Sequence, residues 1–287
     1  MPVLVLALVL AAAVAHASWN FFAKGARGSV AFTFTMAASA EVVYLPLALG
    51  VYLWTRPSLG WDALLFVGVS GALNAAYFLL LTEGYRLGDL SLVYPLARGT
   101  GPALSVVGAI VLFGERPTAV ALAGAALVVT GIIVMSWTPG RTSGAEAGRS
   151  IFFALATGAC IAAYTLWDSK GVTIVTPILY SYGLDLSRAA LLAPLALSTR
   201  SGRAEVASVL RTQRRPLLAI AILSPGAYIL VLAALTISDV SYVAPAREIS
   251  ILFGALLGLR LLGEGDARRR LAGAGAIVAG IFALALG

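Results

Sequence analysis

Residues 122–132 read LAGAALVVTGI, and residues 271–281 read LAGAGAIVAGI. Aligned without gaps, the two segments are identical at seven of eleven positions, and both are apolar and rich in small residues. They lie 149 residues apart in a chain of 287 residues. Self-similarity of this kind indicates that the chain contains two copies of one structural unit.

Other segments repeat in the same order in both halves of the chain. They are YLPLAL (44–49) with LAPLAL (192–197), AAYFLL (75–80) with GAYILV (226–231), DLSLVYPLAR (89–98) with DVSYVAPAR (239–247), and FGE (113–115) with LGE (262–264). We therefore divide the chain into two units, residues 1–140 and residues 150–287.

The composition indicates the class of protein. Hydrophobic residues make up 60% of the chain, charged residues make up 11%, and the mean hydropathy is +0.94. A soluble domain carries about 25% charged residues. Runs of roughly 20 apolar residues, the length that a helix needs to cross a bilayer, follow one another along the chain without the alternation of β-barrel strands. The chain is therefore predicted to be an all-α integral membrane protein.

Ten transmembrane helices are predicted, five in each unit. Their approximate ranges are 2–22, 30–54, 61–82, 91–113, 118–137, 151–168, 177–198, 216–235, 242–262 and 267–286. Because five is odd, the second unit enters the membrane from the opposite side, so the units form inverted five-helix repeats. Inverted repeats are a recurring architecture of secondary transporters, in which one half moves against the other.

The loops between the spans carry an uneven distribution of Lys and Arg. One side has fourteen, and the opposite loops have only Arg56, Arg116 and Lys170. The positive-inside rule places the larger set in the cytoplasm and both termini outside, in a multi-pass protein of the inner (plasma) membrane. The larger set is Lys24, Arg27, Arg86, Arg141, Arg149, Arg200, Arg203, Arg211, Arg214, Arg215, Arg260, Arg268, Arg269 and Arg270.

The net charge of +7 is spread over loop ends and does not indicate nucleic-acid binding. The segment 199–216, which holds five arginines, is predicted to be a loop that anchors the topology, with anionic lipid binding as the alternative. Cys160 is the only cysteine and lies within a span, so neither a disulfide framework nor a thiolate metal cluster is expected. No cofactor and no metal are expected. The first apolar run lacks the basic start of a signal peptide and is predicted to remain as a span.

Ionisable residues inside the spans are expected to have a structural or functional role, since each charge costs roughly 2.5–3.5 kcal/mol at the bilayer centre. They are His16, Glu41, Arg98, Asp185, Arg188, Arg247 and Glu248. Asp185 and Arg188 are three residues apart, which places them side by side on a helix. They are either an internal ion pair or part of a substrate site. Glu41 and Asp185 are the candidates for carrying a coupling proton.

Arg98 and Arg247 occupy equivalent positions in the two units, and each follows a proline that removes a helix hydrogen bond. Gly99 and Gly101 are expected to loosen the span of Arg98 further. An arginine beside an interrupted helix is suited to bind a carboxylate or a phosphate. The alternative is that both arginines extend to a membrane face or neutralise Glu41 and Glu248.

Aromatic side chains inside the bundle offer an apolar body and a hydrogen-bonding tip. Tyr77 and Tyr228 are equivalent in the two units, and Asn74 lies one turn before Tyr77. Spans 118–137 and 267–286, rich in Gly and Ala, are expected at the periphery. The predicted substrate-binding set, around one central cavity, is His16, Trp19, Asn74, Tyr77, Tyr94, Arg98, Tyr164, Tyr228 and Arg247.

Two segments, HASWNFFAKG (16–25) and YPLARGTGPALSVVGAIVLFGE (94–115), resemble EamA-type members of the drug/metabolite transporter superfamily. The paired GE followed by LAGAALVVTGI resembles the closing hairpin of each EamA unit. The resemblance covers nearly the whole chain and implies ten spans in two units. It also implies transport, with YddG-like amino-acid exporters as the expected subgroup.

These observations favour a secondary transporter that exports small polar or amphipathic metabolites, amino acids first, by alternating access. Translocation of a lipid-linked sugar is the alternative within transport. An intramembrane enzyme is disfavoured because the chain has neither an H-E-x-x-H nor a G-x-S-x-G motif. The expected partners are the substrate and membrane lipids. A monomer is expected, because the GxxxG of Gly254 and Gly258 serves more simply to pack helices within the chain, with a dimer interface as the alternative.

Overall fold

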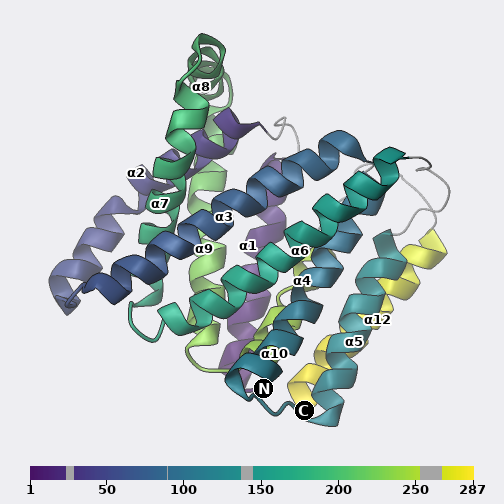
Figure 1. Cartoon of the computed structure of the whole chain (residues 1–287). Coiled ribbons are helices and arrows are strands. Elements are labelled where there is room, and N and C mark those ends of the chain that lie inside the picture. The colour runs from purple at the N-terminus through teal and green to yellow at the C-terminus, as the bar shows by residue number, and fades with distance from the viewer. Residues whose placement is uncertain (24–28, 89, 137–144, 253–266) are drawn as a thin grey trace.

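The computed structural model describes residues 1–23, 29–88, 90–136, 145–252 and 267–287, and these residues contain helices and no β-strand (Figure 1). The helices are α1 (Val3–Ala23), α2 (Val30–Thr55), α3 (Trp61–Leu87), α4 (Leu90–Phe113), α5 (Ala119–Ser136), α6 (Ala145–Gly171), α7 (Pro177–Leu197), α8 (Arg200–Thr212), α9 (Arg214–Leu235), α10 (Val240–Ala246) and α12 (Ala267–Leu286).

Several of these helices are suited to cross a membrane. Six of those described, α1, α2, α3, α4, α6 and α9, are long and apolar enough. The helices α5 and α12 contain shorter apolar stretches, Ala119–Val134 and Leu271–Leu286. Trp54 and Trp61, at the ends of α2 and α3, are 89% and 87% exposed, as suits the aromatic belt at a membrane–water interface. The prediction of an all-α membrane protein is confirmed.

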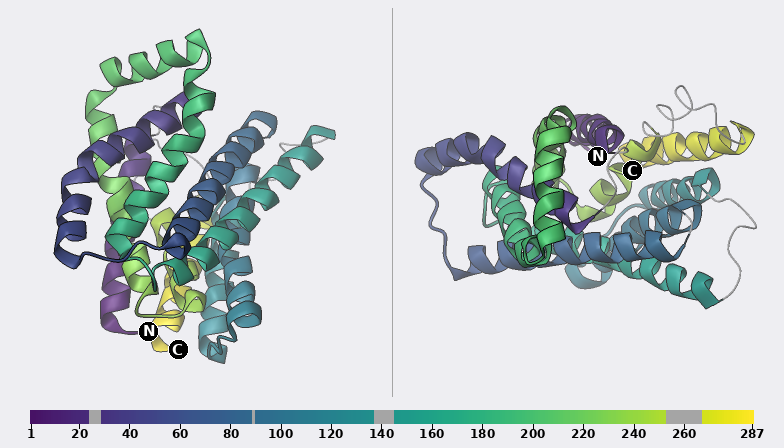
Figure 2. Two further views of the ribbon diagram at one scale, coloured as in Figure 1. Left: turned by 60° about the vertical axis from the view of Figure 1, so that its left-hand side comes forward. Right: turned by 90° about the horizontal axis from the view of Figure 1, so that it is seen from above.

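The repeated segments pack against each other along α5 and α12, which lie side by side at one end of the molecule (Figures 1 and 2). A Cβ added to Gly124 would come within 2.7 Å of the Gly280 carbonyl oxygen, and one added to Gly131 within 2.6 Å of the Gly273 carbonyl oxygen. Glycine is therefore required here for the backbones to approach.

These two glycine contacts are related by the sequence repeat. In the alignment Gly124 corresponds to Gly273, and Gly131 corresponds to Gly280. Exchanging the two units therefore converts the contact of Gly124 with Gly280 into the contact of Gly273 with Gly131. A two-fold axis between two antiparallel helices requires this self-complementary pairing, so the pairing carries the signature of inverted repeats.

Some contacts between the other helices follow the same symmetry. The first-unit helices α1 to α5 correspond to α6, α7, α9, α10 and α12 of the second unit. In agreement with this correspondence, α1 packs on α9 as α6 packs on α3, while α2 packs on its own counterpart α7. The helices α4 and α10, which carry Arg98 and precede Arg247, also contact each other.

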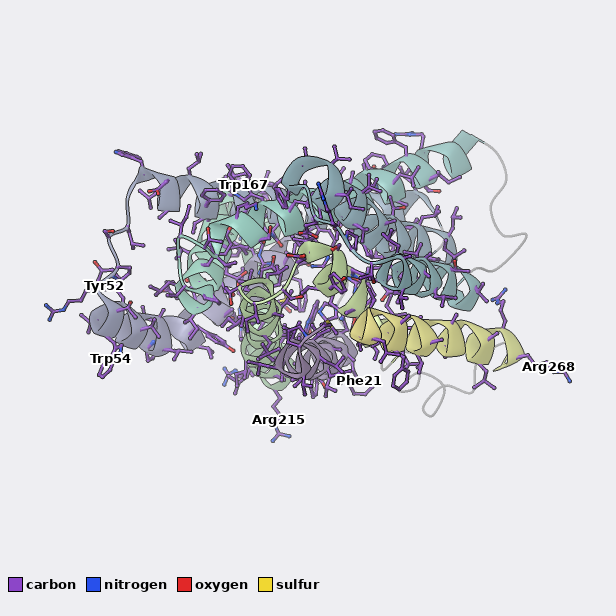
Figure 3. All side chains as sticks on the ribbon, turned by 90° about the horizontal axis from the view of Figure 1, so that it is seen from below. Phe21, Tyr52, Trp54, Trp167, Arg215 and Arg268 are labelled. Carbon is purple, nitrogen blue, oxygen red and sulfur yellow. The ribbon has the colours of Figure 1, made fainter. Side chains whose placement is uncertain are left out.

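The prediction of a loop at 199–216 was wrong, because these residues form the amphipathic helix α8 before α9 begins. Thr199 caps α8 by accepting a hydrogen bond from the Gly202 backbone N–H. Val209 is buried against residues of α2 and α9, whereas Arg215, just beyond α8, points away from the molecule (Figure 3). A helix of 13 residues with one buried face has a low average hydropathy, so a search for apolar runs does not detect it.

The first copy of the repeated GE motif, Gly114 and Glu115, joins the two units. Gly114 has a φ of +68°, a conformation that glycine adopts without strain and that lets the chain turn after α4. The Glu115 carboxylate then accepts hydrogen bonds from the backbone N–H groups of Val240 and Ser241, at 3.0 and 2.9 Å. A carboxylate at this position satisfies free N–H groups at the start of a helix, so Glu115 fixes α10. Gly254, Gly258 and the second GE lie outside the described residues.

Candidate functional site

A cavity of about 110 Å³ lies between α1, α3, α4, α6, α7, α9 and the residues after α10. Neither α5 nor α12 contributes to its lining as far as the structure describes them. Eight of the nine predicted substrate-binding residues line this cavity. They are His16, Trp19, Asn74, Tyr77, Arg98, Tyr164, Tyr228 and Arg247.

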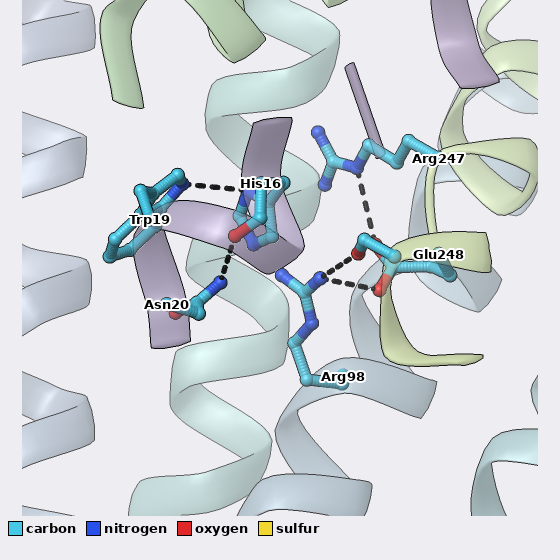
Figure 4. A network of polar contacts seen from close by, with 7 residues as sticks. His16, Trp19, Asn20, Arg98, Arg247 and Glu248 are labelled. Carbon is cyan, nitrogen blue, oxygen red and sulfur yellow. Dashed lines mark hydrogen bonds and ion pairs between the residues drawn. The ribbon is translucent and has the colours of Figure 1, made fainter. Parts of the chain in front are cut away.

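Two arginines and one carboxylate form the charged centre at this cavity. The Arg98 Nη2 is 2.9 Å from Glu248 Oε2, and the Arg247 Nε is 3.2 Å from Glu248 Oε1. The arginine side chains are only 11% and 10% exposed, and that of Glu248 is fully buried. Figure 4 shows the three side chains converging, with His16 between this cluster and Trp19. Neither arginine extends to a membrane face, and of the two glutamates proposed as their partners Glu248 is the one paired.

Arg247 and Glu248 lie where a helix is interrupted. The helix α10 ends at Ala246, a turn follows at Arg247 and Glu248, and helical conformation resumes at 249–252. Pro245 has no N–H and cannot continue the regular hydrogen bonds of the helix. The Glu248 N–H donates to the Pro245 carbonyl and the Ile251 N–H to the Glu248 carbonyl, both in the tighter three-residue spacing. The interruption predicted before Arg247 is therefore present.

The corresponding interruption in the first unit is absent, and that expectation was wrong. The helix α4 is continuous from Leu90 to Phe113, although Pro95 and Pro102 lie within it. Gly101 serves packing instead, since an added Cβ would lie 2.7 Å from the Ile161 Cγ2 of α6. Close packing of α4 on α6 holds the helix together despite its prolines.

Some buried arginine donors lack partners. Within the described part of the chain, Arg98 Nε, Arg188 Nε and Arg247 Nη2 make no hydrogen bond. A buried donor without a partner costs about 1–3 kcal/mol. Arginine donors bind carboxylates and phosphates in charge-assisted, often bidentate hydrogen bonds. The arrangement is therefore suited to an anionic group of a ligand.

Asp185 and Arg188 form the ion pair that their spacing predicts. Their side chains approach to 2.6 Å, and both are buried while lining the cavity. The Arg188 guanidinium also lies over the Phe78 ring, 5.1 Å from its centroid, a cation–π arrangement. The pair adds no net charge to the cavity wall.

Aromatic rings form another part of the wall. The Tyr164 ring lies edge-on to Tyr77 at 6.1 Å and to Tyr228 at 6.4 Å, and the Arg247 guanidinium is 5.7 Å from its centroid. The Trp19 indole N–H donates to His16 Nδ1 at 3.3 Å. Because an indole N–H can only donate, His16 Nδ1 is unprotonated in this arrangement and its Nε2 carries the N–H.

Two candidate residues lie away from the cavity lining. The Tyr94 hydroxyl is within hydrogen-bonding reach of the Arg98 guanidinium, so Tyr94 contacts the site through that arginine. Glu41 of α2 faces the Tyr182 hydroxyl, and its Oε2 is buried without a hydrogen-bond partner in the described chain. Of the two candidates for carrying a proton, Asp185 lines the cavity and Glu41 does not.

Asp168 is a buried polar residue that the sequence prediction missed. It lies in α6 and is fully buried. The Tyr180 hydroxyl donates to Oδ1 at 2.8 Å, and the Tyr228 hydroxyl donates to Oδ2. Asp168 was overlooked because the sixth span was predicted to end there, whereas α6 continues to Gly171. Its position four residues after Tyr164, on the same helix face, was the available signal.

The sequence matches the model of the EamA-like transporter family twice, over residues 3–137 and 148–286. A comparison with curated proteins gives no match. Twenty-nine chains of solved structures match. One of them, described as "Crystal structure of protein", has a TM-score of 0.74 and 16% sequence identity, over 98% of this chain and 96% of that chain. At this identity the similarity shows the fold alone.

Proposed function

Because the chain belongs to the EamA-like transporter family, we propose that it transports small metabolites that carry a carboxylate, amino acids first, through the central cavity. The proposed direction is export across the inner membrane. The activity of this family is transport, and the cavity between the two units is the natural position for a substrate in a transporter built from repeats.

The observation that carries this proposal is the pair of incompletely bonded arginines. Arg98 Nε and Arg247 Nη2 are buried donors without partners among the described residues, and both arginines line the cavity. A substrate carboxylate would satisfy such donors with charge-assisted hydrogen bonds. The tyrosines beside them offer apolar faces and hydroxyls, which suits an amphipathic side chain.

The location of the arginines supports alternating access. Arg98 belongs to the first unit and Arg247 to the second, so a carboxylate held by both would bridge the two units. A movement of one unit against the other changes the distance between these guanidinium groups. Binding would then favour one arrangement of the units over the other, which is the condition for a ligand to shift a conformational equilibrium.

Counterflow into proteoliposomes tests the proposal. Vesicles loaded with an unlabelled amino acid are expected to take up the same labelled amino acid. The amine formed by removing the carboxyl group from that amino acid should exchange poorly, because it has no group for the arginines to bind. Equal exchange of the amino acid and its decarboxylated amine would contradict a carboxylate site.

A further inference from the structure

Four carboxylates are buried in the membrane helices that the structure describes, and they fall into two classes. Asp185 pairs with an arginine at 2.6 Å, and Glu248 pairs with two arginines at 2.9 and 3.2 Å. Glu41 and Asp168 form no ion pair with a described residue. Binding a proton breaks an existing ion pair, which costs the paired carboxylates a stabilising interaction. The unpaired carboxylates have no such interaction to lose.

Asp168 is surrounded by hydroxyl groups from three other helices. Tyr180 of α7 and Tyr228 of α9 donate to its two oxygens. Ser70 of α3 also faces the carboxylate, and its hydroxyl is buried without a hydrogen-bond partner in the described chain. Two further titratable residues, Tyr164 and Arg247, interact with Asp168 through charge. Neither forms an ion pair or a hydrogen bond with Asp168 in the described part of the chain.

This surrounding accommodates a carboxyl group with or without its proton. A buried ionised carboxylate is costly unless it is hydrogen-bonded, and the hydroxyls supply donors for the ionised form. A hydroxyl oxygen also accepts hydrogen bonds, so the same residues accept the O–H of the protonated acid after their hydroxyls rotate. A guanidinium can only donate. Hydroxyl partners therefore permit reversible proton binding in a way that the arginine partners of Asp185 and Glu248 do not.

Tyr228 connects Asp168 to the cavity. Its hydroxyl bonds to Asp168, and Tyr228 itself lines the cavity beside Tyr164. While the Tyr228 O–H donates to ionised Asp168, the Tyr228 oxygen is available to accept a hydrogen bond from a substrate ammonium group. Protonated Asp168 donates its own O–H to that oxygen and so competes with the substrate for it. Proton and substrate therefore disfavour each other's binding, as the exchange of one for the other requires. Glu41 interacts with the cavity-lining residues Asp185 and Arg188 through charge alone, and its hydrogen-bonding neighbour is Tyr182, which does not line the cavity.

We propose that Asp168 is the proton-binding site that couples transport to a pH gradient, with the Tyr228 hydroxyl linking the proton to the substrate. This inference rests on the proposed function. The ionised carboxylate takes up one proton from water on one side of the membrane and becomes a neutral acid. It releases the same proton to water on the other side after the units have moved. One proton thus crosses inward for each substrate molecule exported.

The test uses the full-length protein in proteoliposomes and two assays. Counterflow at equal pH on both sides measures substrate exchange, and flux driven by an imposed pH gradient measures coupling. Asp168→Asn keeps the shape of the side chain but cannot bind the proton. It is expected to retain counterflow and to lose the increase in flux that the gradient produces in the unmodified protein. Asp62→Asn, an exposed aspartate in the first turn of α3, is the matched control and should behave as the unmodified protein.

The outcomes separate this inference from the proposed function. If Asp168→Asn still responds to the gradient, or if Glu41→Gln loses the response while Asp168→Asn keeps it, the assignment to Asp168 is wrong and the transport function stands. Counterflow without any response to pH in the unmodified protein also overturns the coupling alone. Absence of counterflow for every carboxylate substrate in the unmodified protein overturns the proposed function.

A second variant covers the case in which Asp168→Asn does not fold. Tyr180→Phe removes one hydroxyl from Asp168 outside the cavity lining. With one donor fewer, the ionised carboxylate is less stabilised, so the pH at which gradient-driven flux is half-maximal should move upward. An unchanged pH profile in a folded Tyr180→Phe protein would contradict the role of Asp168.

Discussion

The contact between α5 and α12 and the charged centre at the cavity are both built from equivalent positions of the repeat, but only the first is symmetric. Gly124 packs against Gly280, which is the counterpart of Gly131. Gly131 packs against Gly273, which is the counterpart of Gly124. Arg98 and Arg247 are also equivalent, yet both bind the same carboxylate, Glu248. The residue of the first unit that corresponds to Glu248 is Gly99.

The difference indicates how a duplicated chain divides its tasks. Where the repeat is kept, it forms the contact that holds the units together. Where the repeat is broken, polar residues of one unit only are added at the centre. Asp168 follows the second pattern, because the alignment of AKG (23–25) with SKG (169–171) sets it opposite Phe22. Broken symmetry therefore identifies the two buried carboxylates, Glu248 and Asp168, whereas the arginines that we expect to bind the substrate occupy equivalent positions.

The symmetric contact should be the most sensitive to substitution. In Gly124→Leu the new side chain would meet backbone atoms of α12, the Gly280 oxygen at 2.7 Å and the Leu284 nitrogen at 2.9 Å. Backbone atoms cannot move aside as a flexible side chain can, so the loss should exceed the roughly 1–3 kcal/mol typical of overpacking. The expected result is little folded protein, measured as the yield of monodisperse protein in detergent.

Gly275→Leu is the matched control for this substitution. It lies on the same helix α12, and nothing lies within 4 Å of a Cβ added there. The yield of Gly275→Leu should equal that of the unmodified protein. A normal yield of Gly124→Leu would show that the units do not depend on this contact.

A substitution in the asymmetric charged centre should have the next largest effect on stability. Glu248→Gln removes the charge that both arginines share and leaves two guanidinium groups facing each other in a buried site. Removing one partner of a buried ion pair costs about 3–5 kcal/mol. We therefore expect a clear decrease in the temperature of thermal unfolding. An unchanged unfolding temperature would show that the arginines find other partners and that Glu248 is not the centre of the cluster.

A smaller effect, confined to transport, is expected from replacing either arginine by lysine. Arg98→Lys and Arg247→Lys keep the charge but lose the planar, two-pronged donor. The loss of one charge-assisted hydrogen bond to the substrate, about 1.5 kcal/mol, corresponds to a decrease of roughly tenfold in kcat/KM for carboxylate substrates. Arg200→Lys, an exposed residue of α8, is the control. A decrease in only one of the two variants would mean that one unit alone holds the carboxylate.

Much of the scaffold was predictable from the sequence because repeated apolar segments report directly on packing. The interruption after Pro245 was predicted from the missing N–H, but the same argument failed at Pro95, where the packing of α4 on α6 keeps the helix intact. The helix α8 was missed because it is amphipathic rather than apolar. The joint binding of Glu248 by Arg98 and Arg247 brings together residues 150 positions apart along the chain, and no local pattern encodes which of several carboxylates an arginine will meet.

The smallest functional effect is expected from a test of the inversion itself. The connection between α2 and α3 and the connection between α7 and α9 are equivalent in the repeat, and inversion places them on opposite sides of the membrane. Ser58 lies in the first connection and Arg203 in the second, and both are exposed. Single cysteines at these positions, in a Cys160→Ser background, should leave transport unchanged. In intact cells an impermeant maleimide should label Ser58→Cys, whereas Arg203→Cys should react only with a permeant reagent, as its cytoplasmic location requires. Labelling of both variants by the impermeant reagent would place the two connections on one side of the membrane. The units would then be parallel repeats. Parallel repeats could not produce the antiparallel pairing of glycines that is found between α5 and α12.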